Sequence, residues 1–446
     1  MIKILDNFFE RKPKNIIKNF DIHLCNILLV LIVLLPISLI SGPFIPDLTI
    51  TLSTIFFLYL TYKYKIFKYY NNSIVKFLLL FWAYLIFSSL ISDNYLFSLK
   101  SSFFYIRFII FSCFVWFLIE NYISFKNFFM ICLMVAFSFV ILDSIYQYFA
   151  NTSLFGNIKP SSRLTGPFGD RQIVGSYLAR LSALLFFLYY FFPFKLNTKF
   201  LVLAILIAVT VLLSGERTSF FLITFIFVGI SFIIFSFKNF LLSFFTYFLL
   251  TILIISSSPS IKERIVTQTL KGLAISQTKL ITDGEKNYFK NKPKKGFYVF
   301  SGGHEAHYLA ALSIFSDNKI FGAGPNMFRK VCSDSKHFKE PQSCTTHPHN
   351  FMLQILAEIG IVGFIFFMFA LAFFLKKIIK YLGNLKFNNK NQLSNLKNIK
   401  TLILDVGFLA NIFIIFLPSG NFFNNYLCAT IFLPLGFYLH NLNNNE

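Results

Sequence analysis

The chain has 446 residues, of which 56% are hydrophobic and only 13% charged, and its mean hydropathy is +0.66. A soluble core of this length does not need so much apolar surface, so the composition predicts an all-α polytopic membrane protein. The formal net charge of +22 favours contact with membrane lipids or anionic substrates. It argues against nucleic acid as a partner, because most of the charge lies at the ends of apolar segments.

About twelve apolar segments follow one another along the chain, each near the length that spans a bilayer. They cover 24–42, 48–62, 74–91, 102–119, 128–149, 173–192, 200–213, 219–235, 240–256, 351–375, 402–417 and 422–439. A long loop separates the ninth segment from the tenth. The sequence therefore predicts three parts, namely an N-terminal membrane bundle at 1–257, a loop at 258–346, and C-terminal membrane helices at 347–446.

Basic residues indicate the orientation of these segments. Lysines gather in short connections that fall on one side of the membrane if there are twelve crossings, and such connections usually face the cytoplasm. They hold Lys63, Lys65, Lys68, Lys126, Lys195, Lys199, Lys238 and the lysines of 376–400. Both termini are then predicted to be cytoplasmic, and the long loop, three arginines and His349 come out together on the external face.

The stretch 347–363 puts two imidazoles and an amide at the mouth of the tenth segment. Pro348 favours an extended backbone before it, so we expect Asn350 or His349 to cap a helix that begins here. The positive end of the helix dipole tends to keep His349 neutral and fit to act as a base. The alternative is an interfacial His-Asn pair that only caps the helix.

The three external arginines, Arg163, Arg171 and Arg217, are more than lipid anchoring requires. Guanidinium groups bind phosphate oxygens in pairs and stay charged, so these residues are candidate ligands of a phosphorylated substrate. Arg217 is the sharpest candidate, since it lies in a tight turn between two apolar segments. The alternatives are snorkelling to the interface or an ion pair between Glu216 and Arg217.

The long loop has two parts. Residues 262–295 are polar and basic and indicate a surface segment, whereas 304–315 fit an amphipathic helix, and the glycines at 322 and 324 predict a turn after it. His304 and His307 share one face of that helix. They could bind a metal with Glu305, but a wet loop more often uses such residues for hydrogen bonds, and we predict no metal site.

Two other sets of residues carry open predictions. Cys332 and Cys344 flank a polar stretch and could form a disulfide if the loop lies outside the cytoplasm. Charges also occur inside apolar segments, where they indicate either internal pairs that orient helices or an ion pathway. These residues are Arg107, Asp143, Arg180, Glu358 and Asp405.

Several stretches resemble the O-antigen ligase and Wzy-type polymerase superfamily. The signature of that family is His-Asn, nine residues, Gly, two residues and a second Gly or similar small residue. Here His349 and Asn350 precede Gly360 and Gly363 at this spacing. Residues 163–178, 215–219, 317–328 and 418–423 look like the same family, so the resemblance covers roughly 160–425.

The resemblance implies a GT-C-like glycosyltransferase of the bacterial inner membrane, with one large periplasmic loop before the tenth of about twelve helices. It implies transfer of a glycan from undecaprenyl diphosphate to a lipid A-core sugar hydroxyl in lipopolysaccharide biosynthesis, at the periplasmic face and without metal or other cofactor. By the same resemblance His349 is the catalytic base and Arg217 holds the donor diphosphate. Many members have another arginine at the start of the loop helix, where this chain has His304 and His307, which become candidate diphosphate ligands.

Other activities stay open at this point. A Wzy-type O-antigen or exopolysaccharide polymerase shares the fold and the chemistry but extends a second lipid-linked unit. Transfer to a protein hydroxyl is a third activity. A transporter or flippase would need a polar pathway at the membrane midplane and matched halves, and we find no such internal symmetry in the sequence.

Overall fold

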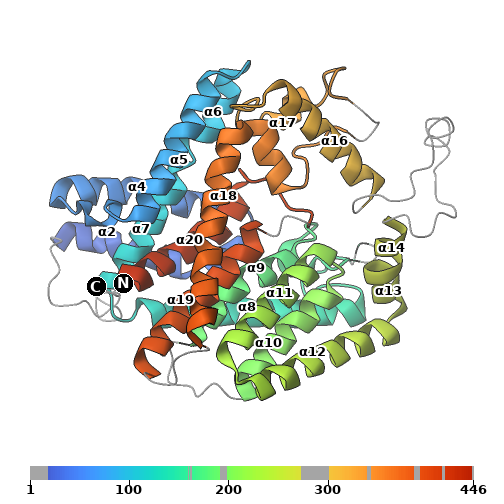
Figure 1. Ribbon diagram of the computed structural model, residues 1–446. Coiled ribbons are helices and arrows are strands. Elements are labelled where there is room, and N and C mark those ends of the chain that lie inside the picture. Colours follow the sequence, from blue (N-terminus) through green and yellow to red (C-terminus); the bar gives the residue numbers. More distant parts are fainter. Residues whose placement is uncertain are drawn as a thin grey trace.

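The computed structural model is built from helices (Figure 1). It describes residues 19–158, 160, 163–190, 198–272, 301–338, 343–385, 392–413 and 417–443. Within these ranges the β-structure amounts to one isolated bridge between Thr152 and Ile158. The all-helical class that the sequence predicts is therefore confirmed, whereas the division into three parts stays a prediction. The predicted basic segment 262–295 lies outside the described residues from 273 on.

Nine α-helices among the described residues precede residue 214. They are α2 (Asn19–Val33), α3 (Leu35–Ser41), α4 (Phe44–Tyr64), α5 (Ser73–Leu90), α6 (Tyr95–Phe103), α7 (Ile106–Asn121), α8 (Phe125–Ala150), α9 (Val174–Tyr189) and α10 (Thr198–Leu213). Next come α11 (Arg217–Ile234), α12 (Phe237–Ser257), α13 (Pro259–Lys262), the π-helical turn η3 (Glu263–Thr267) and α14 (Gln268–Gly272). The C-terminal part consists of α16 (Gly302–Asp317), α17 (Phe328–Val331), α18 (Phe351–Leu385), α19 (Gln392–Phe413) and α20 (Asn425–Asn443).

Seven stretches of helix in the described ranges are long and apolar enough to cross a membrane. They are α4, α5, Tyr95–Asn121, α8, α11, α12 and Phe351–Tyr381 of α18. The pair α2 and α3, bent by 59°, would make an eighth span. The remaining predicted segments also contain helices, but α9 and α10 are short, with 16 residues each. These helices point to a membrane protein, and the full count of about twelve crossings stays a prediction.

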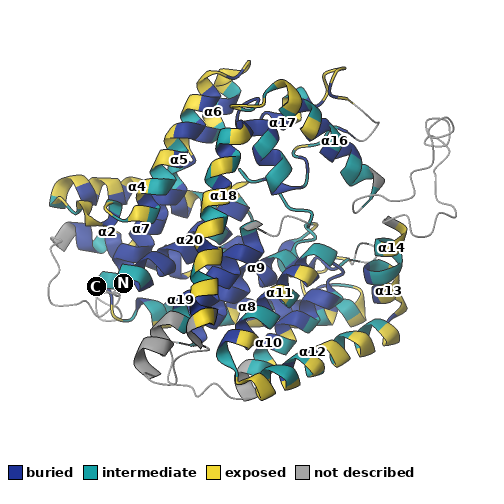
Figure 2. Cartoon of the chain, in the orientation of Figure 1, coloured by how far each residue is buried: buried dark blue, intermediate teal, exposed yellow. Residues whose placement is uncertain are grey.

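The buried centre of the molecule is formed by α7, α9 and α20 (Figure 2). Side chains are buried all round α7 from Phe108 to Ile119 and nearly all round α9. By contrast, α12 lies at the edge with most of its side chains at the surface. Gly436 of α20 allows α7 to come so near that a Cβ there would lie 2.5 Å from the Cβ of Val115. Such close approach is how helices associate where lipid tails are as apolar as their side chains.

Charged residues inside the apolar segments have polar partners that orient the helices. Arg107 of α7 forms an ion pair with Asp47 of α4, with Nη2 and Oδ1 2.7 Å apart. Arg180 of α9 donates to the backbone carbonyl of Asn411 in α19 at 3.2 Å. Asp143 and Asp405 accept hydrogen bonds from the backbone of Leu154 and the hydroxyl of Tyr438. These contacts favour the interpretation that such charges orient helices.

α18 is interrupted at Gly360, and the turn 319–324 of the long loop fills the interruption. Gly360 has φ 62° and ψ −165°, so two backbone carbonyls before it and two N–H groups after it lose their helical partners. Each bonds to the turn instead. The bonds are Ala323 N to Ala357 O at 3.0 Å, Gly324 N to Glu358 O at 2.8 Å, Ile361 N to Lys319 O at 2.8 Å, and Val362 N to Ile320 O at 3.3 Å.

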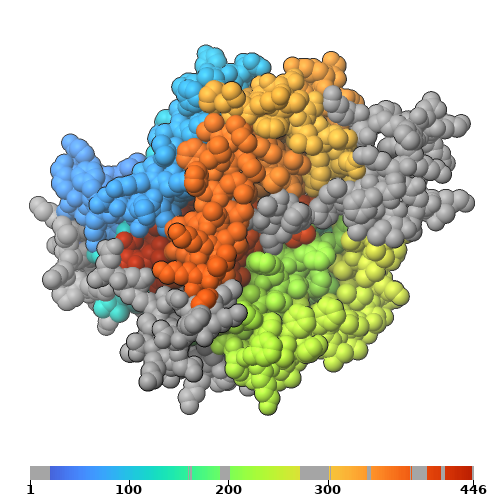
Figure 3. Space-filling view, viewed as in Figure 1, coloured from blue at the N-terminus to red at the C-terminus, as the bar shows by residue number. Residues whose placement is uncertain are grey.

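This contact leaves no space for side chains. A Cβ on Gly360 would lie 2.3 Å from the carbonyl oxygen of Ile320, and one on Gly322 would lie 2.3 Å from the backbone carbon of Glu358. The hydroxyls of Ser88 on α5 and of Ser92 just after it donate to backbone carbonyls of the same turn, at 2.9 and 2.6 Å. The turn is thus attached to both α5 and α18, which Figure 3 shows in blue and orange on one face.

A small second core holds α16 against α18. It is made of Ala310, Ala311, Ile314, Ala323, Met327, Phe328, Cys332 and Ala357. Beside it, Cys332 and Cys344 form a disulfide with their Cα atoms 5.2 Å apart. Glu358 lies beneath this core, where its carboxylate accepts the N–H of Phe328 and the side-chain amide of Gln354, both at 2.9 Å. The predicted loop helix and the turn after it are therefore both present and tightly anchored.

Gly360→Ala should destabilise the protein by about 1–3 kcal/mol, because the methyl group meets backbone atoms and the residue must keep a positive φ. The measurement is thermal unfolding of the purified protein in detergent. Gly383→Ala is the matched control, since Gly383 lies in the same helix with open space around it. Equal melting temperatures for Gly360→Ala and wild type would contradict the close contact.

Thiol labelling should distinguish the paired cysteines from the other four of the chain, which form no disulfide in the structure. In denaturant without reductant, a maleimide of high mass should modify four thiols, and after reduction it should modify six. The readout is the number of mass shifts on a gel. Six modified thiols before reduction would show that Cys332 and Cys344 are not bonded in the cell.

Candidate active site

His347, His349 and Asn350 lie where the loop enters α18. The Asn350 side chain accepts the N–H of Leu353 at 3.1 Å, so Asn350 rather than His349 is the helix cap. His349 has a positive φ of 55°, which is uncommon for a residue with a side chain. The backbone N–H of Ser419 donates to the His349 carbonyl at 2.8 Å and holds it there. Such strained backbone is often found at functional sites.

Three other imidazoles gather around His349, so that four lie together. Its ring centroid lies 4.1 Å from that of His347, 5.3 Å from His307 and 5.8 Å from His304. His304 and His307 come from the first turns of α16, which Ser301 caps by accepting the N–H of His304 at 3.3 Å. The packing of α16 on α18 therefore joins histidines that are more than forty residues apart in the chain.

Burial and neighbouring positive charge favour the neutral form of three of these imidazoles, those of His304, His347 and His349. Burial, and then His349, His307 and Arg217, lower the pKa of His304 to about 4. Burial and then His349 lower the pKa of His347 to about 3. Burial and then His307 lower the pKa of His349 as well. Near pH 7 the His349 ring is therefore in the form that accepts a proton.

Among the described residues, no group of three or more His, Cys, Asp or Glu side chains has the arrangement of a metal site. The His304 and His307 side chains are instead bound to the loop. Nδ1 of His304 lies 2.7 Å from the Ser301 hydroxyl, and Nδ1 of His307 donates to the Ser343 carbonyl at 3.4 Å. These bonds fix both rings toward His349.

A second group of charges surrounds the turn 214–217 between α10 and α11. Three arginines from separate segments adjoin this turn, namely Arg163, Arg217 and Arg264. Arg217 belongs to the turn itself. Arg163 is next to it in space because the N–H of the following residue, Leu164, donates to the Ser214 carbonyl at 3.1 Å. Arg264 reaches the turn directly, since its Nε donates to the Gly215 carbonyl at 3.3 Å. We call these three residues the arginine cluster.

Glu216 is hydrogen-bonded to the start of α9, and its carboxylate also interacts electrostatically with Arg163. Its buried carboxylate accepts the N–H groups of Gly175 and Ser176 at 2.7 and 3.0 Å, and the hydroxyl of Ser219 at 2.9 Å. Within the described ranges, none of the three arginines forms an ion pair. The alternative of an ion pair between Glu216 and Arg217 therefore does not hold, and the half-buried guanidiniums beside the turn keep their positive charge without an ion-paired carboxylate.

The other predicted arginine, Arg171, is engaged elsewhere. Its guanidinium donates to the carbonyl of Ile40 at the end of α3, at 3.4 Å. Arg163 donates to the side chain of Gln172 at 3.1 Å, while its buried Nε has no hydrogen-bond partner within the described part of the chain. Arg163 thus joins the arginine cluster, and Arg171 supports the packing of α3 instead.

Arg217 connects the arginine cluster to the four imidazoles. Its charge is one of the causes of the low pKa of His304, whose ring is 5.8 Å from that of His349. The guanidiniums at the start of α11 and the imidazoles at the start of α18 therefore border one region. A base and several fixed cations in one region suit a reaction in which a hydroxyl loses its proton while negative charge builds up on a leaving group.

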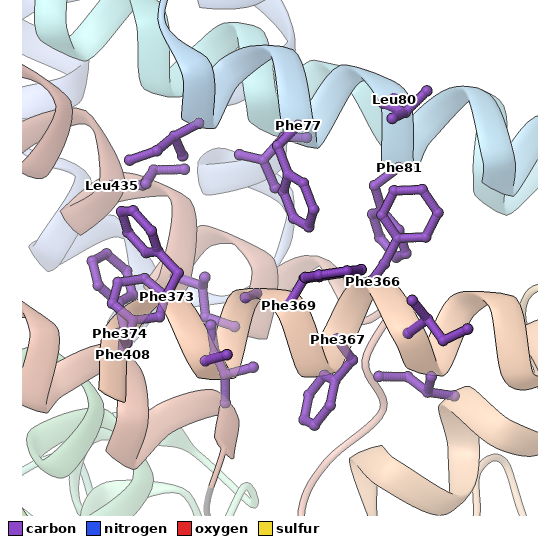
Figure 4. Close-up of a pocket in the computed structure, with 18 of the residues that line it drawn as sticks. Phe77, Leu80, Phe81, Phe366, Phe367, Phe369, Phe373, Phe374, Phe408 and Leu435 are labelled. Carbon is purple, nitrogen blue, oxygen red and sulfur yellow. The ribbon is translucent and has the colours of Figure 1, made fainter. Parts of the chain in front are cut away.

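A large apolar cavity begins beside this region and runs between α5 and α18. Its volume is about 780 Å³, and phenyl rings from the two helices face each other across it (Figure 4). Ile355 and Phe422 line the end near His349, and Lys376 lines it near the other end of α18. Such walls suit a hydrocarbon chain, because they offer almost no hydrogen bonds.

Two features of the site escaped the sequence analysis. Arg264 lies in a charged stretch that resembles any polar loop, and only its bond to Gly215 places it beside Arg217. The cavity is lined largely by phenylalanines that are scattered over four helices and the segment before α20, and that are indistinguishable in sequence from other apolar positions. His347 was visible in the motif, but its contact with His349 depends on the fold of the turn.

Residues 202–368 match a family model described as O-antigen ligase. The matched region covers less than half of the chain, and it includes Arg217, the arginine-bearing turn after α12, α16 and the start of α18. A search of curated proteins found no match.

Proposed function

Since residues 202–368 place this chain in the O-antigen ligase and Wzy superfamily, we propose that it is the ligase itself. It transfers a glycan from undecaprenyl diphosphate to a sugar hydroxyl of lipid A-core. The single observation that supports this most strongly is the position of His349. Its neutral imidazole lies next to the ring of His304, and the charge of Arg217 helps to lower the pKa of His304. We place the site at the periplasmic face of the bacterial inner membrane, with both termini in the cytoplasm.

In the proposed reaction, His349 accepts the proton of the acceptor hydroxyl as the oxygen attacks the anomeric carbon of the donor. The bond between that carbon and the diphosphate breaks, and its electron pair leaves with the diphosphate. Arg217 and Arg163 offset the charge that develops there. A base of this kind contributes about 10²–10⁴-fold to the rate.

His304 and His307 complete the donor site in this proposal. Both rings are held toward His349 by loop contacts, at the edge of the region where the diphosphate would lie. When the Ser301 hydroxyl donates to Nδ1 of a neutral His304, Nε2–H of that ring is left to donate to a phosphate oxygen without adding charge near the base. Nδ1–H of His307 goes to the Ser343 carbonyl, so His307 would donate to phosphate only when its Nε2 is protonated as well. The arrangement therefore binds an anion while leaving the base unprotonated, and it uses only groups of this chain.

The apolar cavity supports a lipid-linked substrate. It is open between membrane helices and ends near His349, so an isoprenoid or acyl chain could occupy it while its polar head reaches the site. About twelve crossings in a GT-C-like arrangement would place the cavity within the bilayer and the loop 258–346 above it.

The polymerase is the second candidate, because a lipid-linked glycan would fit the same cavity and the same base. Transfer to a protein hydroxyl is a third. A transporter is less well supported, since the polar groups gather at one end of α18 and the cavity that follows is apolar. Reconstitution with a lipid-linked donor and either lipid A-core or a second lipid-linked unit separates the first two by which acceptor is extended.

His349→Ala should abolish glycan transfer in the reconstituted protein, with a loss of at least about 10²-fold, because it removes the imidazole that we propose as the general base. Expression, membrane insertion and melting temperature should stay close to those of wild type. His23→Ala on α2 is the control for the loss of a histidine outside the site. Transfer at near wild-type rate by His349→Ala would remove the base assignment.

Arg217→Lys should reduce transfer at least tenfold, because a point charge cannot replace two parallel hydrogen bonds to phosphate; this corresponds to about 1.4 kcal/mol or more. Arg171→Lys is the matched control, since that guanidinium contacts a backbone carbonyl of α3. Initial rates over a range of donor concentrations give the comparison. If both variants transfer normally, Arg217 has no role in binding the donor.

A further inference from the structure

We propose that Arg264, on the π-helical turn η3, is a third ligand of the donor diphosphate and makes the site selective for diphosphate over monophosphate lipids. This inference rests on the proposed function, since it concerns the substrate of the same site. Neither the sequence motifs nor the position of the charged stretch 262–295 singled out this residue.

Two reciprocal hydrogen bonds hold Arg264 beside Arg217. Arg264 reaches from η3 to the turn before α11, where its Nε donates to the carbonyl of Gly215 at 3.3 Å. Arg217 reaches in the opposite direction, and its Nη1 donates to the hydroxyl of Thr269 on α14 at 3.4 Å. The two guanidiniums therefore lie in the same crossing of two short segments.

The nearby carboxylates of Glu263 and Glu216 make their hydrogen bonds and ion pairs with other groups than these arginines. Glu263 precedes Arg264 but pairs with Lys271 on the exposed side of the turn, with its Oε1 3.3 Å from Nζ. The Glu216 carboxylate accepts hydrogen bonds from two backbone N–H groups at the start of α9. Arg163 contributes a third guanidinium, whose buried Nε has no partner within the described residues. The fold thus brings three guanidiniums together with no ion-pairing carboxylate among the described residues, and Glu216 interacts only electrostatically with one of them, Arg163.

This crowding is unfavourable without an anion. Burial, and then the charges of Arg163 and Arg217, lower the pKa of Arg264, which shows that the cations repel one another. Proteins keep such arrangements chiefly where a ligand supplies the opposite charge. The π-helical turn that carries Arg264 is itself a rare geometry that occurs often at functional sites.

The number of guanidiniums indicates the kind of anion. One arginine binds two oxygens of a phosphate group, so three arginines offer more paired hydrogen bonds than a single phosphate can accept. A diphosphate carries more charge and more oxygens over a greater length. We therefore expect Arg264 to matter more for a diphosphate than for a monophosphate.

The test measures binding of three lipids to the full-length protein in nanodiscs: undecaprenyl diphosphate, undecaprenyl phosphate and phosphatidylglycerol. Arg264→Gln should weaken binding of the diphosphate by roughly tenfold, and Arg264→Lys by roughly threefold, as expected for losing a charge-assisted pair or only its fork geometry. Binding of the other two lipids should change less than twofold by the same reasoning. Lys271→Gln, in the same short segment, should bind all three as wild type does.

The outcomes separate this inference from the proposed function. If wild type binds the diphosphate and Arg217→Lys does not, but both Arg264 variants bind it normally, Arg264 only supports the Gly215 turn and the inference is wrong. An equal loss for all three lipids would make Arg264 a general anchor for anionic lipids and would also overturn it. If wild type itself does not prefer the diphosphate, the proposed function fails first.

Discussion

The exchange of backbone hydrogen bonds between the interrupted helix α18 and the turn 319–324 is the contact on which the site depends. An interruption inside a membrane helix exposes N–H and carbonyl groups that lipid cannot satisfy, at a cost of several kcal/mol each. Here the turn satisfies four of them, and Gly360 and Gly322 make room for the approach. Because the turn follows α16 directly, this contact also brings His304 and His307 to His349. The spacing from His349 to Gly360 and Gly363 thus reflects one piece of architecture.

The oppositely charged side chains of the 214–217 turn contact different parts of the molecule. The turn 214–217 directs its carboxylate toward the start of α9 and its arginine toward the imidazoles. The Arg217 guanidinium, which suits an anionic ligand, therefore also helps to keep the His304 ring neutral. A carboxylate within ion-pair distance of Arg217 would neutralise its charge. Arg217 would then neither attract an anion nor favour the neutral form of His304. Polar groups gather at one end of α18, and an apolar cavity follows, as a substrate with a charged head and a hydrocarbon tail requires.

Much of this could be predicted from the sequence because it depends on local order. Long apolar runs determine where helices form, so the helical class, the loop helix at 304–315 and the turn after it were all predicted. Asn350 beside an apolar run predicts a helix start, and the structure shows that Asn350 is the cap. Residues such as Arg217 stood out because a charge in a tight turn between apolar segments is costly unless it is used.

Only the tertiary structure decided which of these residues meet. In the sequence, Arg163, Arg171 and Arg217 all lie next to apolar segments. In the structure, Arg171 bonds to α3, while Arg163 borders the 214–217 turn. Arg264 looked like surface charge until its bond to Gly215 placed it beside Arg217. Sequence by itself determined the helices and the chemical types at their ends, since periodicity and charge are properties of neighbouring residues. The pairing of those ends arises from packing between segments far apart in the chain, which local pattern does not encode.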